Sequence, residues 1–337
     1  MLKGNKLRTG LTFDDVLLVP KQGVLKKRKD ADISSELVHG IKLNVPIVSA
    51  NMPSVTDSKM AEAMFHAGGY GFLHRFNEVD ENVLEYNRVT SWLDTADWDH
   101  NNADAVVSFG LNDLARVTRL YNAGARIFCL DVAHGDHMSV AQEVRLFRQR
   151  FEEAYLIVGN IATYDAALRL MPLGIDAYKV GIGPGAACRT REVTGFGVPQ
   201  LTAIMDVAKV TDMYPSMKLI ADGGIKNSGD IVKALAAGAD TVMIGSLLAG
   251  CNESPNPGEY YGNASEYVNG HRAPEGSHGT VERKGSVEDV IKELAWGIRS
   301  GISYGGATNI PELRERAEFI QVTAAGQYES SIRINSL

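Results

Sequence analysis

The segment GIGPGAACRT, residues 181–190, places a cysteine in a loop that is built to expose it. Its glycines allow tight backbone turns, and Pro184 stiffens the part of the loop that presents Cys188. The Thr190 hydroxyl and the arginines that flank it favour the thiolate, which is the nucleophilic form of a cysteine. The glycine spacing does not match the dinucleotide-binding G-x-G-x-x-G pattern. We therefore predict that Cys188 is a covalent nucleophile.

The remaining cysteines have no such setting, and a lone cysteine is more often a small core residue than a catalytic one. We expect the structural role for Cys129, which lies inside an apolar run, and for Cys251, which no activating pattern surrounds. The 3 cysteines lack CxxC spacing, which argues against a zinc ribbon and a disulfide framework. His134 and His137 lie beside Asp131, but no further ligand pattern accompanies them, so we do not expect a transition-metal site.

The composition is that of an ordinary globular protein. With 337 residues and 45% apolar content, the chain can bury a sizeable core. The net charge of -7 gives no basic surface for nucleic acid, so we expect no nucleic-acid partner. The N-terminus is short, polar and basic, and no run approaches the ~18 apolar residues of a membrane span. We therefore expect a cytoplasmic protein with no membrane partner.

Short apolar runs alternate with segments of helical spacing, as expected for repeated βα units around a buried parallel sheet. About eight runs occur, at residues 45–51, 69–74, 105–110, 126–135, 155–162, 177–185, 218–224 and 241–250. Amphipathic stretches such as SKMAEAMFHAGG and GDIVKALAAGAD lie between them. Glycine, Asp, Asn or Cys stands near the end of most runs, which favours an α/β fold of the (β/α)8 TIM-barrel type. The pattern alone leaves a doubly wound open sheet as the alternative.

Residues 251–285 break this alternation with a polar segment rich in turn formers. We expect an active-site flap there. A disordered surface insertion is the alternative, although Tyr260, Tyr261 and Tyr267 would be unusual in a purely solvated loop. No linker composition and no other internal repeat is visible. We therefore predict a single domain over residues 1–337 with a flap insertion and without a regulatory tandem domain.

Ordered motifs extend from the cysteine loop through the rest of the chain. GIGPGAACRTREVTGFGVPQ is followed by ADGGIKNSGDIVKALAAGAD and VMIGSLLAG, and LTFDDVLLVP, PIVSANM and ISYGGATNI complete the set. Together these motifs resemble the IMP dehydrogenase/GMP reductase family over essentially the whole chain. The resemblance implies a (β/α)8 barrel, usually a homotetramer, that binds a purine nucleotide across the strand ends with a nicotinamide stacked against its base.

The same resemblance implies the residues that bind the substrate, GMP or IMP. Asp222 would offer its carboxylate to both ribose hydroxyls, and the amides of Gly223 and Gly224 would approach the phosphate. The other implied substrate-binding residues are Gly245 and Ser246, which add phosphate donors, Tyr261 and Gly262, which complete the phosphate cradle, Ser49 and Met52, which pack on the nucleotide, and Arg272 and Gly276 in the flap. A plain strand end at Asp222 and a core role for Met52 are the structural alternatives.

Cofactor and cation sites follow from the same resemblance. The positions implied near the cofactor are Asp131, Ala133 and Asn160 at the nicotinamide ribose and ring, and His74 and Arg75 at a strand end that approaches it. An ordinary solvent-facing pair is the alternative for the last two. The backbone carbonyls of Gly183, Gly185 and Cys188 match the family's monovalent cation site, which implies K⁺. We expect NADPH as the cofactor, with NADH and NAD left open.

The flap has to separate the two activities of the family, because both add a cysteine thiolate to carbon 2 of the purine. The dehydrogenase hydrolyses that adduct with an Arg-Tyr pair in its flap, and this chain contains no Arg-Tyr dipeptide. Its short segment YGNASEYVNGHRAPEG instead resembles the reductase, in which Glu275 and Thr190 would protonate the leaving ammonia. We therefore expect a GMP reductase, which converts GMP to IMP and ammonia through a covalent thioimidate on Cys188.

Two alternatives remain open at this point. Strings such as ESP at 253–255 and PEG at 274–276 resemble the dehydrogenase equally well, so the first alternative is an NAD-dependent IMP dehydrogenase with a shortened flap. The second is a nucleotide-binding barrel without catalysis, since a fold and a phosphate site do not imply turnover. The presence of Cys188, Thr190 and Glu275 argues against the second.

Overall fold

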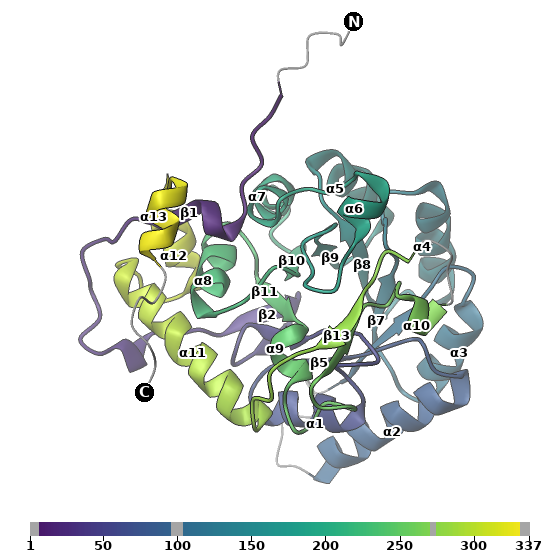
Figure 1. Ribbon diagram of the computed structural model, residues 1–337. Helices are drawn as coiled ribbons and strands as arrows, with labels where there is room; N and C mark the ends of the chain where they lie inside the picture. Colours follow the sequence, from purple (N-terminus) through teal and green to yellow (C-terminus); the bar gives the residue numbers. More distant parts are fainter. Residues whose placement is uncertain (1–6, 96–103, 270–273, 331–337) are drawn as a thin grey trace, which may run out of the picture.

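Eight parallel strands close into a barrel at the centre of the molecule (Figure 1). The computed structural model describes residues 7–95, 104–269 and 274–330. In chain order the barrel strands are β4 (Ile47–Ser49), β5 (Tyr70–Leu73), β6 (Val106–Phe109), β7 (Ile127–Asp131), β8 (Tyr155–Ile161), β9 (Ala177–Val180), β10 (Lys218–Asp222) and β11 (Thr241–Ile244). Each predicted apolar run contains one of them, and β11 pairs with β4 to complete the ring. The predicted (β/α)8 barrel is confirmed, and the open-sheet alternative is wrong.

A helix follows each barrel strand and packs on the outside of the ring. These helices are α1 (Ser58–His66), α2 (Val79–Thr95), α3 (Leu114–Asn122), α4 (Met138–Arg150), α5 (Tyr164–Leu170), α7 (Gln200–Thr211), α8 (Ser228–Ala236) and α11 (Val287–Tyr304). Polar side chains fix where several of them begin, because they accept hydrogen bonds from first-turn amides. Asp57 caps α1, Asn227 caps α8 and Ser286 caps α11 in this way.

The described barrel strands are mostly apolar, with a buried lysine as a notable exception. Every residue of β5, β6, β7, β9 and β11 is buried, as expected for parallel strands that are covered on both faces. The exception is Lys179 in β9, whose residue is only 3% exposed. A buried ammonium group requires acidic partners, so this lysine marks the part of the barrel where charged groups meet.

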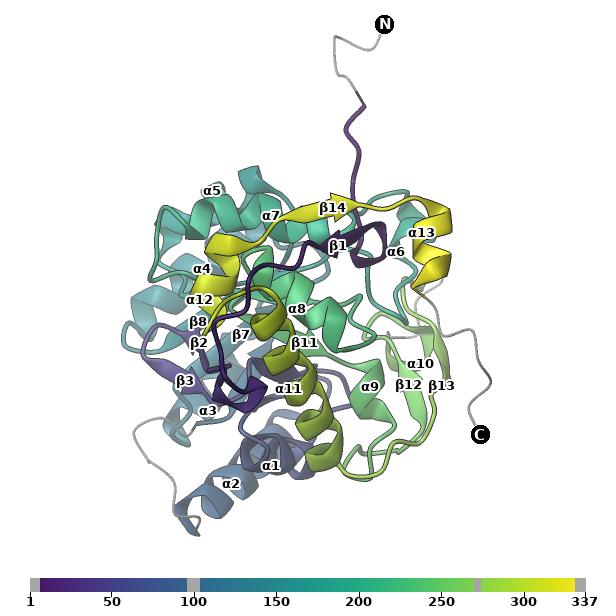
Figure 2. The ribbon, with the colours of Figure 1, turned by 90° about the vertical axis from the view of Figure 1, so that its left-hand side faces the viewer.

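Short elements outside the ring cover its ends. Strand β1 (Val16–Leu18) pairs antiparallel with β14 (Phe319–Gln321), and β2 (Ser35–Val38) pairs with β3 (Ile41–Leu43). Figure 2 shows β1 and β14 side by side, next to α13 (Ala324–Glu329). The other short helices are η1 (Phe13–Asp15), η2 (Arg28–Asp30), η3 (Met171–Leu173), α6 (Thr190–Thr194), α9 (Ser246–Ala249) and α12 (Ile310–Arg316). Among the described residues, no helix is long and apolar enough to cross a membrane.

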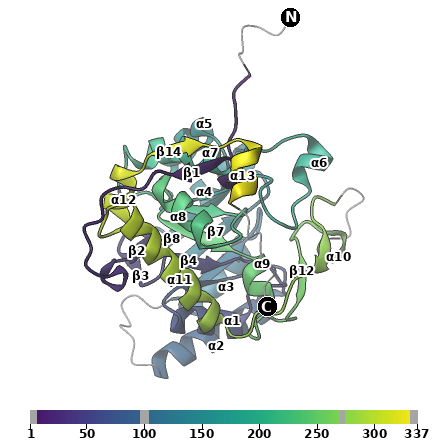
Figure 3. The same cartoon turned by 60° about the vertical axis from the view of Figure 1, so that its left-hand side comes forward.

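The described part of the predicted flap is an ordered hairpin. Strand β12 (Glu259–Tyr261) pairs antiparallel with β13 (His278–Thr280), and α10 (Glu266–Asn269) lies in the connection between them. Figure 3 shows β12 and α10 on the same side of the barrel as α6, which follows the cysteine. The flap therefore lies next to the loop after β9.

Candidate active site

The thiol of Cys188, the hydroxyl of Thr190 and the carboxylate of Glu275 form one chain of hydrogen bonds. Cys188 Sγ lies 3.2 Å from Thr190 Oγ1, and Thr190 Oγ1 lies 2.7 Å from Glu275 Oε2. The thiol donates to the hydroxyl and the hydroxyl donates to the carboxylate. A proton can therefore move from sulfur toward Glu275. The structure thus brings together the three residues that were predicted to be catalytic.

Backbone hydrogen bonds hold the flap against the cysteine loop. The Arg189 N–H donates to the Glu275 carbonyl at 2.6 Å, and the Ser277 N–H donates to the Ala187 carbonyl at 2.8 Å. Cys188 and Gly276 form an isolated antiparallel bridge between these contacts. The position of Glu275 beside Thr190 is thus fixed by main-chain pairing on both sides of it.

The two arginines near Cys188 use their guanidinium groups elsewhere. Arg189 Nε bonds Glu192 at 3.1 Å, and Arg191 Nη2 donates to the Val198 carbonyl at 2.9 Å. The side chain of Arg191 also packs against Gly183, where a Cβ atom would lie 2.7 Å from Arg191 Cγ. Arg191 therefore braces the loop, and closeness in sequence was a poor guide to its role.

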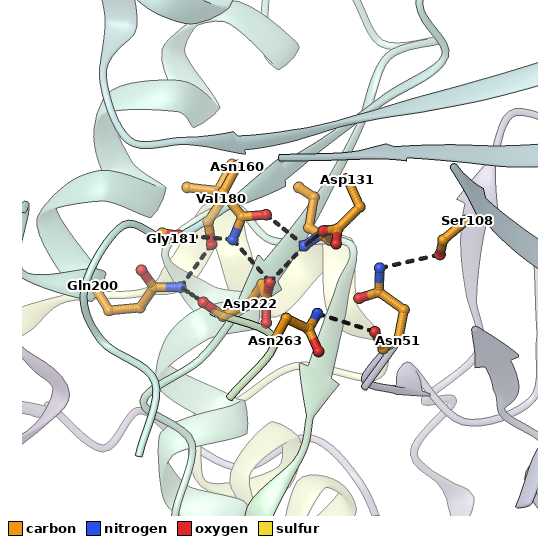
Figure 4. A network of polar contacts seen from close by, with 10 residues as sticks. Asn51, Ser108, Asp131, Asn160, Val180, Gly181, Gln200, Asp222 and Asn263 are labelled. Atoms are coloured by element: carbon orange, nitrogen blue, oxygen red, sulfur yellow. Dashed lines mark hydrogen bonds and ion pairs between the residues drawn. The ribbon is translucent and has the colours of Figure 1, made fainter. Parts of the chain in front are cut away.

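Asp222 is the last residue of β10, and the Gln200 side chain bonds its main-chain carbonyl. Gln200 Nε2 donates to the carbonyls of Val180 and Asp222, at 2.8 and 3.0 Å, and so clamps the ends of β9 and β10 together (Figure 4). Gly223 then turns the chain with φ +94°, a conformation that favours glycine. A Cβ atom on Gly223 would lie 3.1 Å from the Gly185 amide nitrogen, so this turn also lets the ADGG segment approach the cysteine loop.

Lys179 connects two carboxylates that belong to different strands. Its ammonium nitrogen lies 2.9 Å from Asp131 Oδ1 and 2.9 Å from Asp222 Oδ2, and it also donates to Asn160 Oδ1. Asn160 Nδ2 donates to Asp222 Oδ2 at 2.8 Å and to the Gly181 carbonyl at 2.7 Å (Figure 4). The ends of β7, β8, β9 and β10 therefore share one polar network.

The charges of Lys179 and Asp131 keep each other ionised. Burial alone would lower the pKa of Lys179, but Asp131 and Asp222 raise that pKa above its ordinary value. Burial would likewise raise the pKa of Asp131, but the charge and hydrogen bond of Lys179, together with Arg75, lower it below the usual range. The cluster thus holds a charged lysine and a charged Asp131 in the barrel interior.

The other residues predicted at the phosphate lie after β11 and at the end of β12. Gly245 follows β11, and Ser246 begins α9. The hydroxyl of Tyr260 lies close to Gly245, since a Cβ atom on Gly245 would lie 2.7 Å from the Tyr260 hydroxyl oxygen. The pKa of Tyr260 is raised by its burial and by the nearby charges of Asp222 and Cys188. Tyr260, which the sequence analysis did not select, therefore faces the site with a protonated hydroxyl.

The neighbouring positions lie deeper in the protein. Tyr261 is buried, and its ring packs 4.7 Å from that of Tyr267, centroid to centroid. Ser49 is fully buried and its hydroxyl accepts a hydrogen bond from Thr56 at 2.8 Å. Gly262 and Gly276 approach closely, since a Cβ atom on Gly262 would lie 3.1 Å from Gly276 Cα. These residues pack inside the protein next to the site, and their contacts with nucleotide stay predictions.

The predicted cofactor residues differ in exposure. Asp131 is buried at the end of β7, whereas Ala133 beyond it is exposed. His74 is 7% exposed, its Nδ1 accepts the Phe76 N–H at 3.2 Å, and burial lowers its pKa to about 4. His74 is therefore neutral at physiological pH and shapes its own loop. Next to it, Arg75 is partly exposed and approaches Gly110, where a Cβ atom would lie 3.0 Å from a terminal guanidinium nitrogen.

Arg272 lies outside the described residues. His137 caps α4, since its Nδ1 accepts the Ser139 N–H at 3.2 Å. Lys179, Gln200 and Tyr260 were not predicted as site residues. Two of them left a signal in the sequence, Lys179 as a lysine inside an otherwise apolar run and Tyr260 as a tyrosine in a polar segment.

The fold and the site together define a (β/α)8 barrel with a cysteine-centred site at the carboxyl ends of its strands. A family model described as "IMP dehydrogenase / GMP reductase domain" matches residues 10–270 and 257–333. This chain belongs to the IMP dehydrogenase/GMP reductase family. It is accordingly an oxidoreductase of a family that acts on purine nucleotides with a nicotinamide dinucleotide.

Curated relatives cover nearly the whole chain. One is the inosine-5'-monophosphate dehydrogenase of Nitrosopumilus maritimus (strain SCM1), 33% identical over 96% of this chain and 98% of the relative. The enzyme of the same name from Cryptosporidium parvum is 34% identical over 96% and 94%. That from Bacillus subtilis (strain 168) is 31% identical over 96% and 95%. The alignment with the first runs over 469 positions, so that relative has residues without a counterpart in this chain.

The names of these relatives correct the sequence-based assignment of activity. We predicted a GMP reductase that uses NADPH, but the three relatives are IMP dehydrogenases. The prediction of a GMP reductase is therefore wrong, and the alternative of an IMP dehydrogenase fits better. It failed because the flap was judged by its length and by a missing Arg-Tyr dipeptide, which describe one way of activating water and not the direction of the reaction.

Proposed function

We propose that the protein oxidises inosine 5'-monophosphate (IMP) at carbon 2 of the purine to xanthosine 5'-monophosphate (XMP), with NAD as cofactor. The hydrogen-bond chain from Cys188 through Thr190 to Glu275 carries the proposal, because it couples a nucleophile to a base. The names of the relatives supply the substrate and the direction. A nucleotide-binding barrel without catalysis would not require this chain of hydrogen bonds.

The first half of the reaction uses the hydrogen-bond chain to create a nucleophile. The Cys188 proton passes through the Thr190 hydroxyl to Glu275, and the thiolate adds to carbon 2 of IMP. The hydride on carbon 2 then leaves, and Cys188 remains bonded to carbon 2 as a thioimidate. A bound nicotinamide dinucleotide supplies the acceptor for this hydride.

The second half removes the nucleotide from the enzyme by hydrolysis. Glu275 first releases the proton that it received from the thiol. A water molecule then adds to carbon 2, its proton passing to Glu275 through Thr190, and the bond from carbon 2 to Cys188 breaks to give XMP. Because the chain contains no Arg-Tyr dipeptide, we propose Thr190 and Glu275 as the groups that activate this water.

Residues around Asp131 fit the cofactor. The Asp131 carboxylate is an acceptor suited to ribose hydroxyls, and Asn160 lies in the same polar network. The buried Arg75 Nε has no hydrogen-bond partner among the described residues, which leaves a donor for a polar group of the cofactor. We propose that these side chains hold NAD, and that His74 acts only through the conformation of its loop.

The remaining family features are also proposals. The carbonyls of Gly183, Gly185 and Cys188 suit a K⁺ ion, although the Gly185 carbonyl already accepts the Cys188 N–H at 3.0 Å and has one lone pair to offer. We propose a homotetramer located in the cytoplasm. We also propose that residues 1–337 form a single catalytic domain with the flap at 251–285.

A direct assay tests the activity. Wild-type protein mixed with IMP and NAD should show a sustained rise in the absorbance of reduced nicotinamide, with XMP as the chromatographic product. The control is the same mixture without IMP. No XMP from IMP, together with steady consumption of NADPH in the presence of GMP, would contradict the proposal.

Replacing Asp222 by alanine should weaken IMP binding by ~2 to 4 kcal/mol, or about 30- to 1000-fold, because charge-assisted bonds to the ribose are lost. Chemistry at saturating IMP should be much less affected, since Asp222 contacts no reacting atom in the proposal. Calorimetry with IMP and steady-state kinetics measure the two effects separately. A Michaelis constant for IMP equal to that of the wild type would remove Asp222 from the site.

A further inference from the structure

Lys179 belongs to the site although its ammonium group faces away from solvent. The residue is 3% exposed, and each of its N–H groups has an acceptor, in Asp131, Asp222 and Asn160. It therefore has no donor left for substrate. Whatever Lys179 does for the reaction, it does through the two carboxylates.

The two carboxylates serve different ligands in the proposed function. Asp222 is the proposed partner of the nucleotide ribose, and Asp131 is the proposed partner of the cofactor ribose. Asp222 Oδ2 is already bonded to Lys179 and Asn160, both within 2.9 Å. Only the other oxygen of Asp222 is then available for ribose hydroxyls, and the contact with Lys179 decides where that oxygen points.

A neutral residue in place of Lys179 would leave Asp131 and Asp222 without the cation that lies between them. Without the lysine, two buried or partly buried carboxylates would face one another across β8 and β9 with no cation between them. Arg75 also acts on Asp131. Asn160 alone cannot neutralise the pair, because its amide is uncharged.

We propose that Lys179 is a positioning residue that orients Asp131 and Asp222 at once, and so sets the affinity of the enzyme for both the nucleotide and the cofactor. This inference rests on the proposed function for the identity of the two ligands. It predicts a signature that simple loss of stability does not give, since two binding constants change together while the chemical step is spared.

The test compares Lys179→Met with Lys218→Met as a matched control. Lys218 begins β10 at the other end of the barrel, where its Nζ bonds Glu36 at 2.8 Å and its side chain is 14% exposed. Lys179→Met should raise the calorimetric dissociation constants for both IMP and NAD by about tenfold or more, the scale expected for breaking a buried charge pair. Its kcat should change much less, and Lys218→Met should leave both constants near their wild-type values. Lys179→Arg, which keeps the charge, should recover part of the affinity for both ligands.

Unchanged affinities for IMP and NAD in a folded Lys179→Met variant would overturn the inference, as would a loss of kcat alone. If Lys179→Met does not fold, a Lys179→Met/Asp131→Asn variant takes its place, because its buried charges balance better. In that background Asp222→Asn should weaken IMP binding less than it does with Asp131→Asn alone, where Lys179 is intact. An equal effect in the two backgrounds would also overturn the inference.

These outcomes are separable from failure of the proposed function. An enzyme that does not convert IMP to XMP would refute the proposed reaction in the wild type, before any variant is made. The calorimetric affinities for IMP and NAD need no turnover, so they decide the role of Lys179 in either case.

Discussion

Replacing Cys188 by alanine is expected to abolish turnover, by about 10⁴-fold or more, while IMP still binds within about tenfold of the wild-type affinity. The thiolate supplies covalent bonding to carbon 2 and contributes little to the affinity of the ground state. Steady-state formation of XMP measures the first effect, and calorimetry with IMP measures the second.

Cys251→Ala is the matched control for this variant. Cys251 is fully buried, its thiol donates to the Leu247 carbonyl, and burial raises its pKa to about 12. Its removal should change stability and leave the chemical step unaltered. A Cys188→Ala enzyme that retains more than a few per cent of the wild-type rate would show that the nucleophile has been misassigned.

Replacing Glu275 by glutamine is expected to slow steady-state turnover by about 100-fold or more, the usual scale for a positioned general base. Glutamine is close to glutamate in size but cannot take the proton that Thr190 relays. Hydrolysis of the covalent adduct should suffer most, because water is a far weaker acid than a thiol and depends more strongly on a base. Hydride transfer occurs before that step and should be slowed less.

Rapid-mixing absorbance spectroscopy can separate these steps. The Glu275→Gln enzyme should release a burst of reduced nicotinamide no larger than the enzyme concentration, followed by slow turnover. Mass spectrometry of the quenched protein should find the nucleotide on Cys188. Glu192→Gln is the control, since Glu192 is exposed and bonds only Arg189 among the described contacts. A Glu275→Gln enzyme with wild-type steady-state turnover would contradict the proposed role of Glu275.

The barrel could be predicted from sequence because its strands follow a simple rule. Parallel strands buried on both faces consist of continuous apolar runs, and the eight runs of this chain each contain one strand. The pairing of Cys188, Thr190 and Glu275 was predicted from family resemblance, and the hydrogen bonds place them together. No local pattern links Thr190 to Glu275, since main-chain pairing between distant segments sets their contact.

Other parts of the site could not be predicted from neighbours in sequence. Arg189 and Arg191 flank Thr190, but their guanidinium groups bond Glu192 and the Val198 carbonyl. Tyr260 and Tyr261 are adjacent, yet successive residues of a strand point to opposite sides, so only Tyr260 faces Gly245. The choice of activity failed for another reason, since flap length and a missing Arg-Tyr dipeptide do not report the direction of the reaction.

Strand β1 precedes the whole barrel and its partner β14 follows it, with Val16 opposite Gln321. During synthesis on a ribosome, β1 emerges early and must wait for nearly all of the remaining chain before its partner exists. The barrel strands pair with neighbours along the chain, apart from the final closure of β11 on β4, and can assemble progressively. In that interval β1 has no strand partner, and its central residue Leu17 is an apolar side chain that stays exposed even in the folded protein. Newly made protein should therefore be most prone to self-association in the interval before β14 is made.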